Sequence, residues 1–166
     1  VGVYRNGRVS IMKSPIEAVA IETHRGQSIY PEPFSQQVSG RVKWKLGEVF
    51  GLSNFGVNIT HIDPGSISAL FHTHAVQDEF IYILEGTPTL IFGDKEFQMK
   101  SGECMGFKAG TGIGHQLVNR SSKTVAYIEV GDRTPNERVE YPHDDIEATS
   151  TPDGSWVFTH KNGASY

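Results

Sequence analysis

The sequence has little of what marks secreted, disulfide-bonded or membrane proteins. Cys104 is the only cysteine, so no disulfide can form within the chain, and a lone thiol fits a reducing compartment. No stretch approaches the roughly 18 consecutive apolar residues of a membrane span, and no charged-then-apolar start of a signal peptide is present. We therefore expect a cytoplasmic protein with no membrane partner.

An excess of positive charge is also absent. The chain has 15 Lys and Arg against 19 Asp and Glu, which gives a formal net charge of −4. A net negative charge provides no general attraction to the phosphates of a nucleic acid. We expect a small molecule, and no nucleic acid, as the ligand.

The most basic segment, residues 41–46, alternates cations with apolar side chains. A period of two indicates a strand, whose two faces carry different residues. In the favoured interpretation Val42, Trp44 and Leu46 face inward and the cations face solvent, as exposed Lys and Arg usually do. The alternative turns the cations towards a phosphate or carboxylate of a ligand.

Sustained helical periodicity and internal repeats are missing, and short apolar runs separated by turn residues take their place. With 166 residues, 18 Gly and 8 Pro, the chain suits one turn-rich domain. Most joins are too short for βαβ crossovers, so neighbouring strands should be antiparallel. The expected strands span residues 55–62, 68–74, 79–84, 89–92, 96–99, 104–107, 115–119 and 123–130.

We expect a single domain, 1–166, in three parts. Residues 1–40 carry two prolines and weak periodicity, which indicates an arm with one or two short strands. Residues 41–131 form the β core, and residues 132–166 an irregular tail that docks on it, with 155–158 apolar enough for a late strand. An arm of this kind and an edge strand that needs cover predict a homodimer.

Chemistry concentrates in one group of residues. His72 and His74 lie two residues apart on an expected strand, so both imidazoles project from the same face. Glu79 follows after a short loop and His115 opens a later strand. Three imidazoles and one carboxylate form a ligand set for a divalent transition metal such as Zn, Mn, Fe, Ni or Co, and are too nitrogen-rich for Ca or Mg.

These residues match the two motifs of the cupin superfamily. The first motif joins glycines, a His-x-His pair and a glutamate, here Gly65, His72, His74, Glu79 and Gly86. The second motif is matched by Gly102, Gly112, His115 and Asn119. It departs from the family at Lys108, where the motif has a proline, and this loss concerns the rigidity of a turn. Asp78 stands beside Glu79, but only Glu79 has the spacing to Gly86.

Over residues 41–131 the sequence resembles a small single-domain bacterial cupin without an assigned reaction. The resemblance implies an all-β fold, an antiparallel double-stranded β-helix or jelly-roll barrel, with one metal ion on the four ligands. It also implies an enzyme acting on a small oxygen-rich metabolite, with a sugar or sugar phosphate isomerase slightly favoured. The alternatives are a dioxygenase or decarboxylase on a small organic acid, or a non-catalytic cupin that binds a small molecule or carbohydrate.

Two residues besides the ligands are candidates for catalysis. His61 lies on the strand before the first motif, where it could act as an acid or base, although a core or surface role is favoured. Lys108 is predicted at the rim of the barrel near His115, where its charge could meet an anionic substrate. In the opposing interpretation the motif histidines are satisfied core residues of a metal-free binder.

Overall fold

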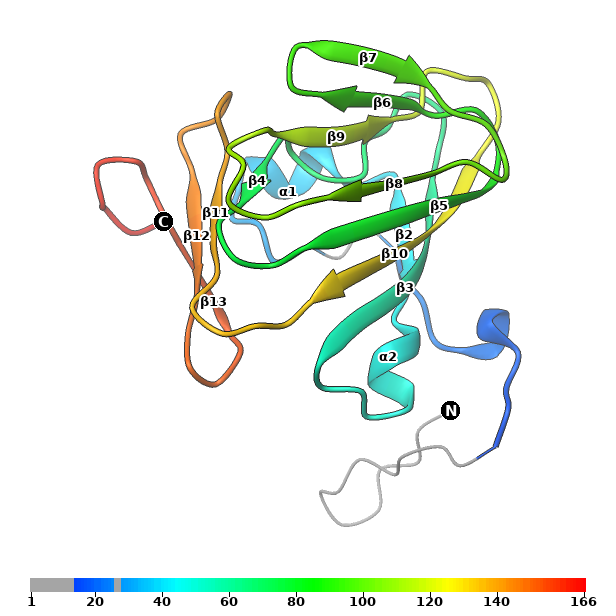
Figure 1. Ribbon diagram of the computed structural model, residues 1–166, viewed down its shortest axis with the longest axis horizontal. Helices are drawn as coiled ribbons and strands as arrows, with labels where there is room; N and C mark the ends of the chain where they lie inside the picture. The colour runs from blue at the N-terminus through cyan, green and yellow to red at the C-terminus, as the bar shows by residue number, and fades with distance from the viewer. Residues whose placement is uncertain (1–13, 26–27) are drawn as a thin grey trace.

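The computed structural model describes residues 14–25 and 28–166. Residues 1–13 and 26–27, which belong to the expected arm, lie outside the described part. The described chain folds into three antiparallel sheets (Figure 1). The largest sheet has, in spatial order, the strands β1 (His24–Arg25), β2 (Arg41–Trp44), β3 (Phe55–Ile62), β10 (Val125–Asp132), β5 (Glu79–Glu85) and β8 (Cys104–Phe107).

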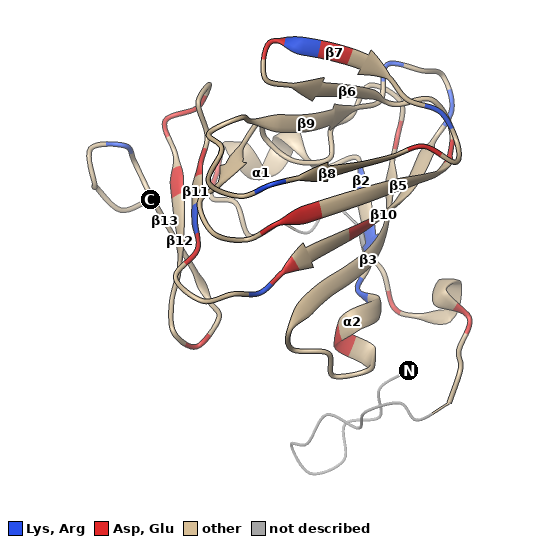
Figure 2. Ribbon diagram, in the orientation of Figure 1, with Lys and Arg blue, Asp and Glu red and all other residues tan. Residues whose placement is uncertain are grey.

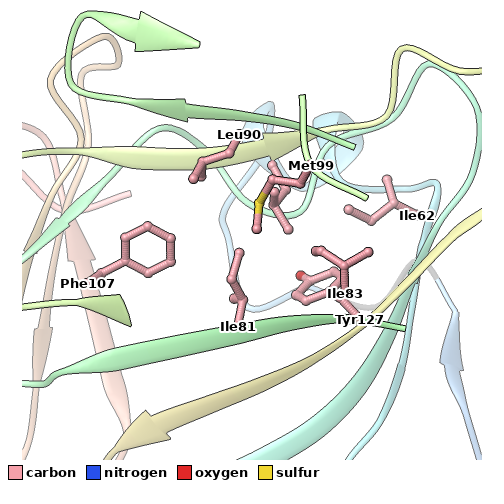
Figure 3. Packing of buried hydrophobic residues seen from close by; sticks show 8 residues of the cluster. Ile62, Ile81, Ile83, Leu90, Met99, Phe107 and Tyr127 are labelled. Atoms are coloured by element: carbon pink, nitrogen blue, oxygen red, sulfur yellow. The ribbon is translucent and has the colours of Figure 1, made fainter. Parts of the chain in front are cut away.

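A three-stranded sheet covers one face of this large sheet and closes the barrel (Figure 1). Its strands are β7 (Lys95–Gln98), β6 (Thr89–Phe92) and β9 (His115–Val118). The main apolar core fills the space between the two sheets (Figure 3). Its members come from both layers and are Ile62, Ile81, Ile83, Leu90, Met99, Phe107, Leu117 and Tyr127.

The tail forms most of the third sheet, in the order β13 (Trp156–Thr159), β12 (Glu147–Ser150), β11 (Arg138–Glu140) and β4 (Thr73–His74). The expected late strand is therefore present, but the expectation of an otherwise irregular tail was wrong. Val139 and Ala148 are buried in a second apolar cluster together with Leu70. Strands of three or four residues give too short an alternation to be recognised, and the partner of β11 is β4, far away in sequence.

Helices are limited to single turns, as the missing helical periodicity predicted. They are η1 (Ala18–Ala20), α1 (Phe34–Gln37) and α2 (Leu46–Val49). Phe34 of α1 is buried in the second cluster. Within the described residues, none of the helices has the length and apolar character that crossing a membrane requires.

Most strand predictions are confirmed to within two residues at each end. The exception is residues 68–74, of which only Thr73 and His74 form a strand. The remainder is held by single bridges and loop hydrogen bonds: Ile67 bridges to Val118, and His72 bridges to His115. An extended segment with buried apolar residues gives the same sequence pattern as a strand with a continuous ladder, so the sequence could not separate the two.

Candidate metal centre and its cavity

Four side chains from three different sheets converge on one point. His74 lies in β4, Glu79 in β5 and His115 in β9, while His72 immediately precedes β4. The Oε2 atom of Glu79 lies 3.8 Å from Nε2 of His72, 3.3 Å from that of His74 and 3.2 Å from that of His115. The potential ligand atoms all lie within 4.8 Å of one another. Ligands at about 2.0–2.2 Å from one ion are at most about 4.4 Å apart, so small movements would let this cluster hold an ion.

Neighbouring groups orient two of the imidazoles. The Nδ1 atom of His72 lies 2.7 Å from the carbonyl oxygen of Leu70. A carbonyl oxygen only accepts, so Nδ1 carries the proton and the lone pair of Nε2 faces the cluster. The ring of His115 stacks on Phe107 with centroids 3.7 Å apart and an interplanar angle of 2°. Both rings are therefore held in an orientation suited to metal binding.

Glu137 supports the third imidazole and the loop that follows it. Its carboxylate is fully buried and accepts hydrogen bonds from the backbone N–H groups of Ala75, Val76 and Gln77. Its Oε2 also lies 3.8 Å from Nδ1 of His74, a buried nitrogen that has no hydrogen-bond partner among the described residues. Sequence reasoning missed Glu137, since it lies in the expected irregular tail and has no motif around it.

The electrostatics of the cluster favour the protonation states that bind metals. Burial raises the pKa of Glu79, but the interactions of its carboxylate with the imidazoles of His115, His72 and His74 together outweigh burial, and the pKa lies well below its usual range. Burial lowers the pKa of His115, against the opposing effect of Glu79. At neutral pH the carboxyl group is therefore ionised and His115 is neutral, the forms that act as metal ligands.

The cluster lines an open cavity of about 1070 Å³. The floor of the cavity is the inner face of the large sheet, with Arg41 and Lys43 among the lining residues. The favoured orientation of residues 41–46 was therefore wrong, and the cations face the interior. Val42 is buried, as expected, but on the opposite face of β2. Alternation identifies which residues share a face; it does not tell a polar cavity from solvent.

A second carboxylate, that of Glu129, lies on the cavity floor. It forms an ion pair with Lys43 and accepts hydrogen bonds from Asn58 Nδ2 at 2.8 Å and the Tyr127 hydroxyl at 3.0 Å. Figure 2 shows acidic residues on β10 and basic residues on β2, within the same sheet. Burial raises the pKa of Glu129, but the charge of Lys43 and the hydrogen bonds from Lys43 and Asn58 together outweigh burial, and the pKa lies below its usual value. Glu129 is the one charged residue in the apolar run 125–130, a sequence signal that could have identified it.

Comparison with known proteins identifies the family. The family model of the cupin domain matches residues 58–131 of the sequence. A crystal structure of a sugar phosphate isomerase of the cupin superfamily, from Silicibacter pomeroyi, is 37% identical, with a TM-score of 0.85 and coverage of 92% of this chain and 96% of that one. The chain belongs to the cupin superfamily. The predicted fold class, an antiparallel cupin barrel, is confirmed.

Two other solved structures are less similar to this chain. A sugar phosphate isomerase candidate from Acidithiobacillus ferrooxidans is 25% identical, with a TM-score of 0.68, over 77% of this chain and 82% of that one. A polyketide cyclase from Streptomyces resistomycificus is 20% identical, with a TM-score of 0.59, over 73% of this chain and 80% of that one, and shares the fold. No curated protein sequence matches this chain.

This cupin compensates for the proline missing at Lys108. Asp78 accepts hydrogen bonds from the backbone N–H of Ala109 at 2.9 Å and from Nζ of Lys108 at 2.9 Å. These bonds, first that from Ala109, lower the pKa of Asp78. Asp78 thus stabilises the turn that leads to His115, and it is not a member of the four-residue cluster.

The two catalytic candidates lie apart from the cavity of this cupin. The side chain of Lys108 is 75% exposed, pairs with Asp78 and is not among the residues that line the cavity. His61 points from the outer face of β3, where its ring lies 4.5 Å from that of Trp44. Neither side chain is placed to act on a ligand bound at the four-residue cluster.

Proposed function

We propose that this cupin is a metal-dependent isomerase that interconverts the aldose and ketose forms of a small sugar phosphate. The observation that carries the proposal is the placement of Glu129 and the four-residue cluster in one cavity. An isomerase needs a titratable group besides the metal ligands, whereas a binding protein does not. The 37% identity to the Silicibacter pomeroyi sugar phosphate isomerase supports the same reaction class.

His72, His74, Glu79 and His115 would hold one divalent transition metal, such as Zn, Mn, Fe, Ni or Co. When bound, the ion would polarise the carbonyl group of an open-chain sugar. Four protein ligands leave one or two positions of a five- or six-coordinate ion open to substrate. The fit of the donor set rests on the Nε2 atoms turned towards Glu79.

The remaining chemistry falls to residues of the floor. Interconversion of an aldose and a ketose moves one proton between neighbouring carbons and one between their oxygens. Glu129, ionised at neutral pH, accepts the proton from one carbon and returns it to the other. Lys43 and Asn58 hold the carboxylate in place, because both contact its Oε1.

Proton exchange in D₂O tests this function. Metal-loaded protein is incubated with D-ribose 5-phosphate or D-fructose 6-phosphate and followed by NMR. We expect the paired ketose or aldose to appear, with deuterium on the carbon next to the carbonyl. Glu129→Gln should retain its metal and lower kcat about 100-fold or more, the usual contribution of a general base. Glu48→Gln, at the mouth of the same cavity, should retain full activity.

The same experiment can contradict this function. Metal-loaded wild-type protein that binds these sugar phosphates and forms no paired sugar would be a binding protein. Product that carries no deuterium would refute proton transfer through Glu129. A Glu129→Gln variant as active as Glu48→Gln would remove Glu129 from the reaction.

We also propose a homodimer formed through the outer face of the large sheet. Alternation along β5 places Phe80, Tyr82 and Leu84 opposite Glu79, and these three side chains are 38–40% exposed. Phe55 on β3 adds another aromatic ring, 42% exposed. Several apolar side chains across neighbouring strands provide the kind of surface that a second copy would cover, at about 800 Å² per partner.

Light scattering coupled to size exclusion tests the dimer at micromolar concentration. Wild-type protein should have twice the mass of the 18.3 kDa chain. Tyr82→Glu should be monomeric, because a charge at the centre of an apolar interface is costly to bury. Val157→Glu, at an equally exposed valine of β13, should remain dimeric. A monomeric wild-type protein would show that the outer face has another use.

A further inference from the structure

Arg41 is a cavity residue whose charge has no carboxylate partner in the part of the chain that the structure describes. Its side chain extends from β2 into the interior, and its Nη1 donates a hydrogen bond to the carbonyl oxygen of Ser68 at 2.6 Å. A guanidinium group has five N–H donors, so most of its capacity is free. Within residues 14–25 and 28–166, no carboxylate forms an ion pair with Arg41.

Three tyrosines share the cavity with Arg41. They are Tyr30, Tyr127 and Tyr141, and all three line it. Burial raises the pKa of each tyrosine, against the opposing effect of the positive charge of Arg41. The tyrosines therefore stay protonated at neutral pH. Tyr127 donates its proton to Glu129, whereas Tyr30 and Tyr141 can donate to a ligand together with Arg41.

The position of these groups relates them to the metal centre. The ring of Tyr141 lies 6.1 Å from that of His72 on one side and 5.7 Å from that of Tyr30 on the other. A ligand that contacts Arg41 and these tyrosines therefore occupies the same cavity as the four-residue cluster. One molecule a few bonds long can reach both.

The charge balance of the interior indicates the sign of that molecule. Lys43 is neutralised by Glu129, whereas Arg41 retains its full charge. A divalent ion on one carboxylate and neutral imidazoles would add further positive charge. An anionic ligand would offset the charge of Arg41, and a neutral one would leave this charge without compensation.

We propose that Arg41, Tyr30 and Tyr141 form an oxyanion-binding site that holds the phosphate group of the substrate while the carbonyl end reaches the metal centre. The proposal rests on the proposed isomerase function. The guanidinium fork matches the oxygens of a phosphate in a bidentate arrangement, which a lysine does not reproduce. Arg133 and Lys45 lie at the exposed mouth, where solvent weakens their attraction for an anion.

Calorimetric titration of metal-loaded protein tests the site without reference to turnover. The probes are inorganic phosphate, D-ribose 5-phosphate and D-ribose. Arg41→Gln should weaken the binding of D-ribose 5-phosphate about 10- to 100-fold and change the binding of D-ribose less than threefold. Arg41→Lys should give an intermediate loss. Arg133→Gln, the matched control at the mouth, should change all three affinities less than threefold.

The titrations also distinguish a phosphate site from its alternatives. Equal affinity of wild-type and Arg41→Gln for D-ribose 5-phosphate removes Arg41 from phosphate binding, even if the protein isomerises sugars. Tighter binding of malonate than of phosphate, lost in Arg41→Gln, assigns the site to a carboxylate and refutes the phosphate. If Arg41→Gln fails to fold, as judged by its thermal transition, Arg41→Lys carries the test. Loss of phosphate binding in a protein without isomerase activity would support the site and refute the proposed function.

Discussion

Replacing His74 or His115 with alanine is expected to abolish stoichiometric metal binding and to lower the melting temperature. Both rings direct Nε2 at Glu79, so each loss leaves an incomplete ligand set. An ion at about 100 times its Kd stabilises the folded state by about 2.7 kcal/mol, which corresponds to about 5–10 °C for a chain of this size. Elemental analysis and thermal melting, with and without a chelator, measure both effects. The chelator should destabilise wild-type protein and leave both variants unchanged.

His143→Ala is the matched control for this experiment. His143 stacks on Phe71 with centroids 4.5 Å apart, as His115 stacks on Phe107, but it is not a member of the ligand cluster. The control should lose a small amount of stability, about 0.5–1.5 kcal/mol, and should bind metal fully. Wild-type protein that takes up no transition metal would refute the metal centre and favour a metal-free binder.

Removal of the buried carboxylate of Glu137 should have the second large effect. Glu137→Ala leaves the backbone N–H groups of Ala75, Val76 and Gln77 without their acceptor. Ala75 and Val76 are exposed residues, so water can replace part of these bonds. A hydrogen bond to a charged group contributes about 1.5–3 kcal/mol, and we expect a loss of about 2 kcal/mol or more in the free energy of unfolding. Because the loop joins His74 to the strand of Glu79, metal affinity should also fall, by about 10- to 100-fold.

Protein stability and Co²⁺ binding, measured separately, distinguish a role of Glu137 in positioning His74 from a role in general stability. Glu137→Gln keeps an acceptor oxygen and should recover part of the stability, yet its Co²⁺ complex should retain a weakened affinity and an altered visible absorption spectrum. Glu140→Ala, at an exposed residue of β11, should change neither property. If Glu137→Ala bound metal as tightly as the wild-type protein, the carboxylate of Glu137 would support the loop and have no part in positioning His74.

The ligand cluster could be predicted because its evidence is local. Two histidines with a period of two fix a shared face, and the motif spacings select Glu79 over Asp78. The structure brings all four predicted residues together. The groups around the cluster could not be predicted in this way. Glu137 lies immediately before β11 and reaches the cluster because β11 pairs with β4, a long-range contact that no local pattern encodes.

The direction of Arg41 and Lys43 was missed for another physical reason. Their strand has a cavity on one side and an apolar outer face on the other, the reverse of a simple barrel with a dry core. Hydrophobic alternation assumes that apolar means inward. This assumption fails where the interior is a polar binding site and the exterior carries apolar residues.

The origin of the ligands in three separate sheets bears on the lifetime of the folded state. The sheets are built from strands distant in sequence, so the complete ligand set exists once all three are in place. An ion that joins them at that late stage leaves the rate of folding nearly unchanged. It raises the barrier to unfolding instead, because the sheets cannot separate without releasing a ligand. A bound ion would therefore slow unfolding and lengthen the time for which each molecule stays folded.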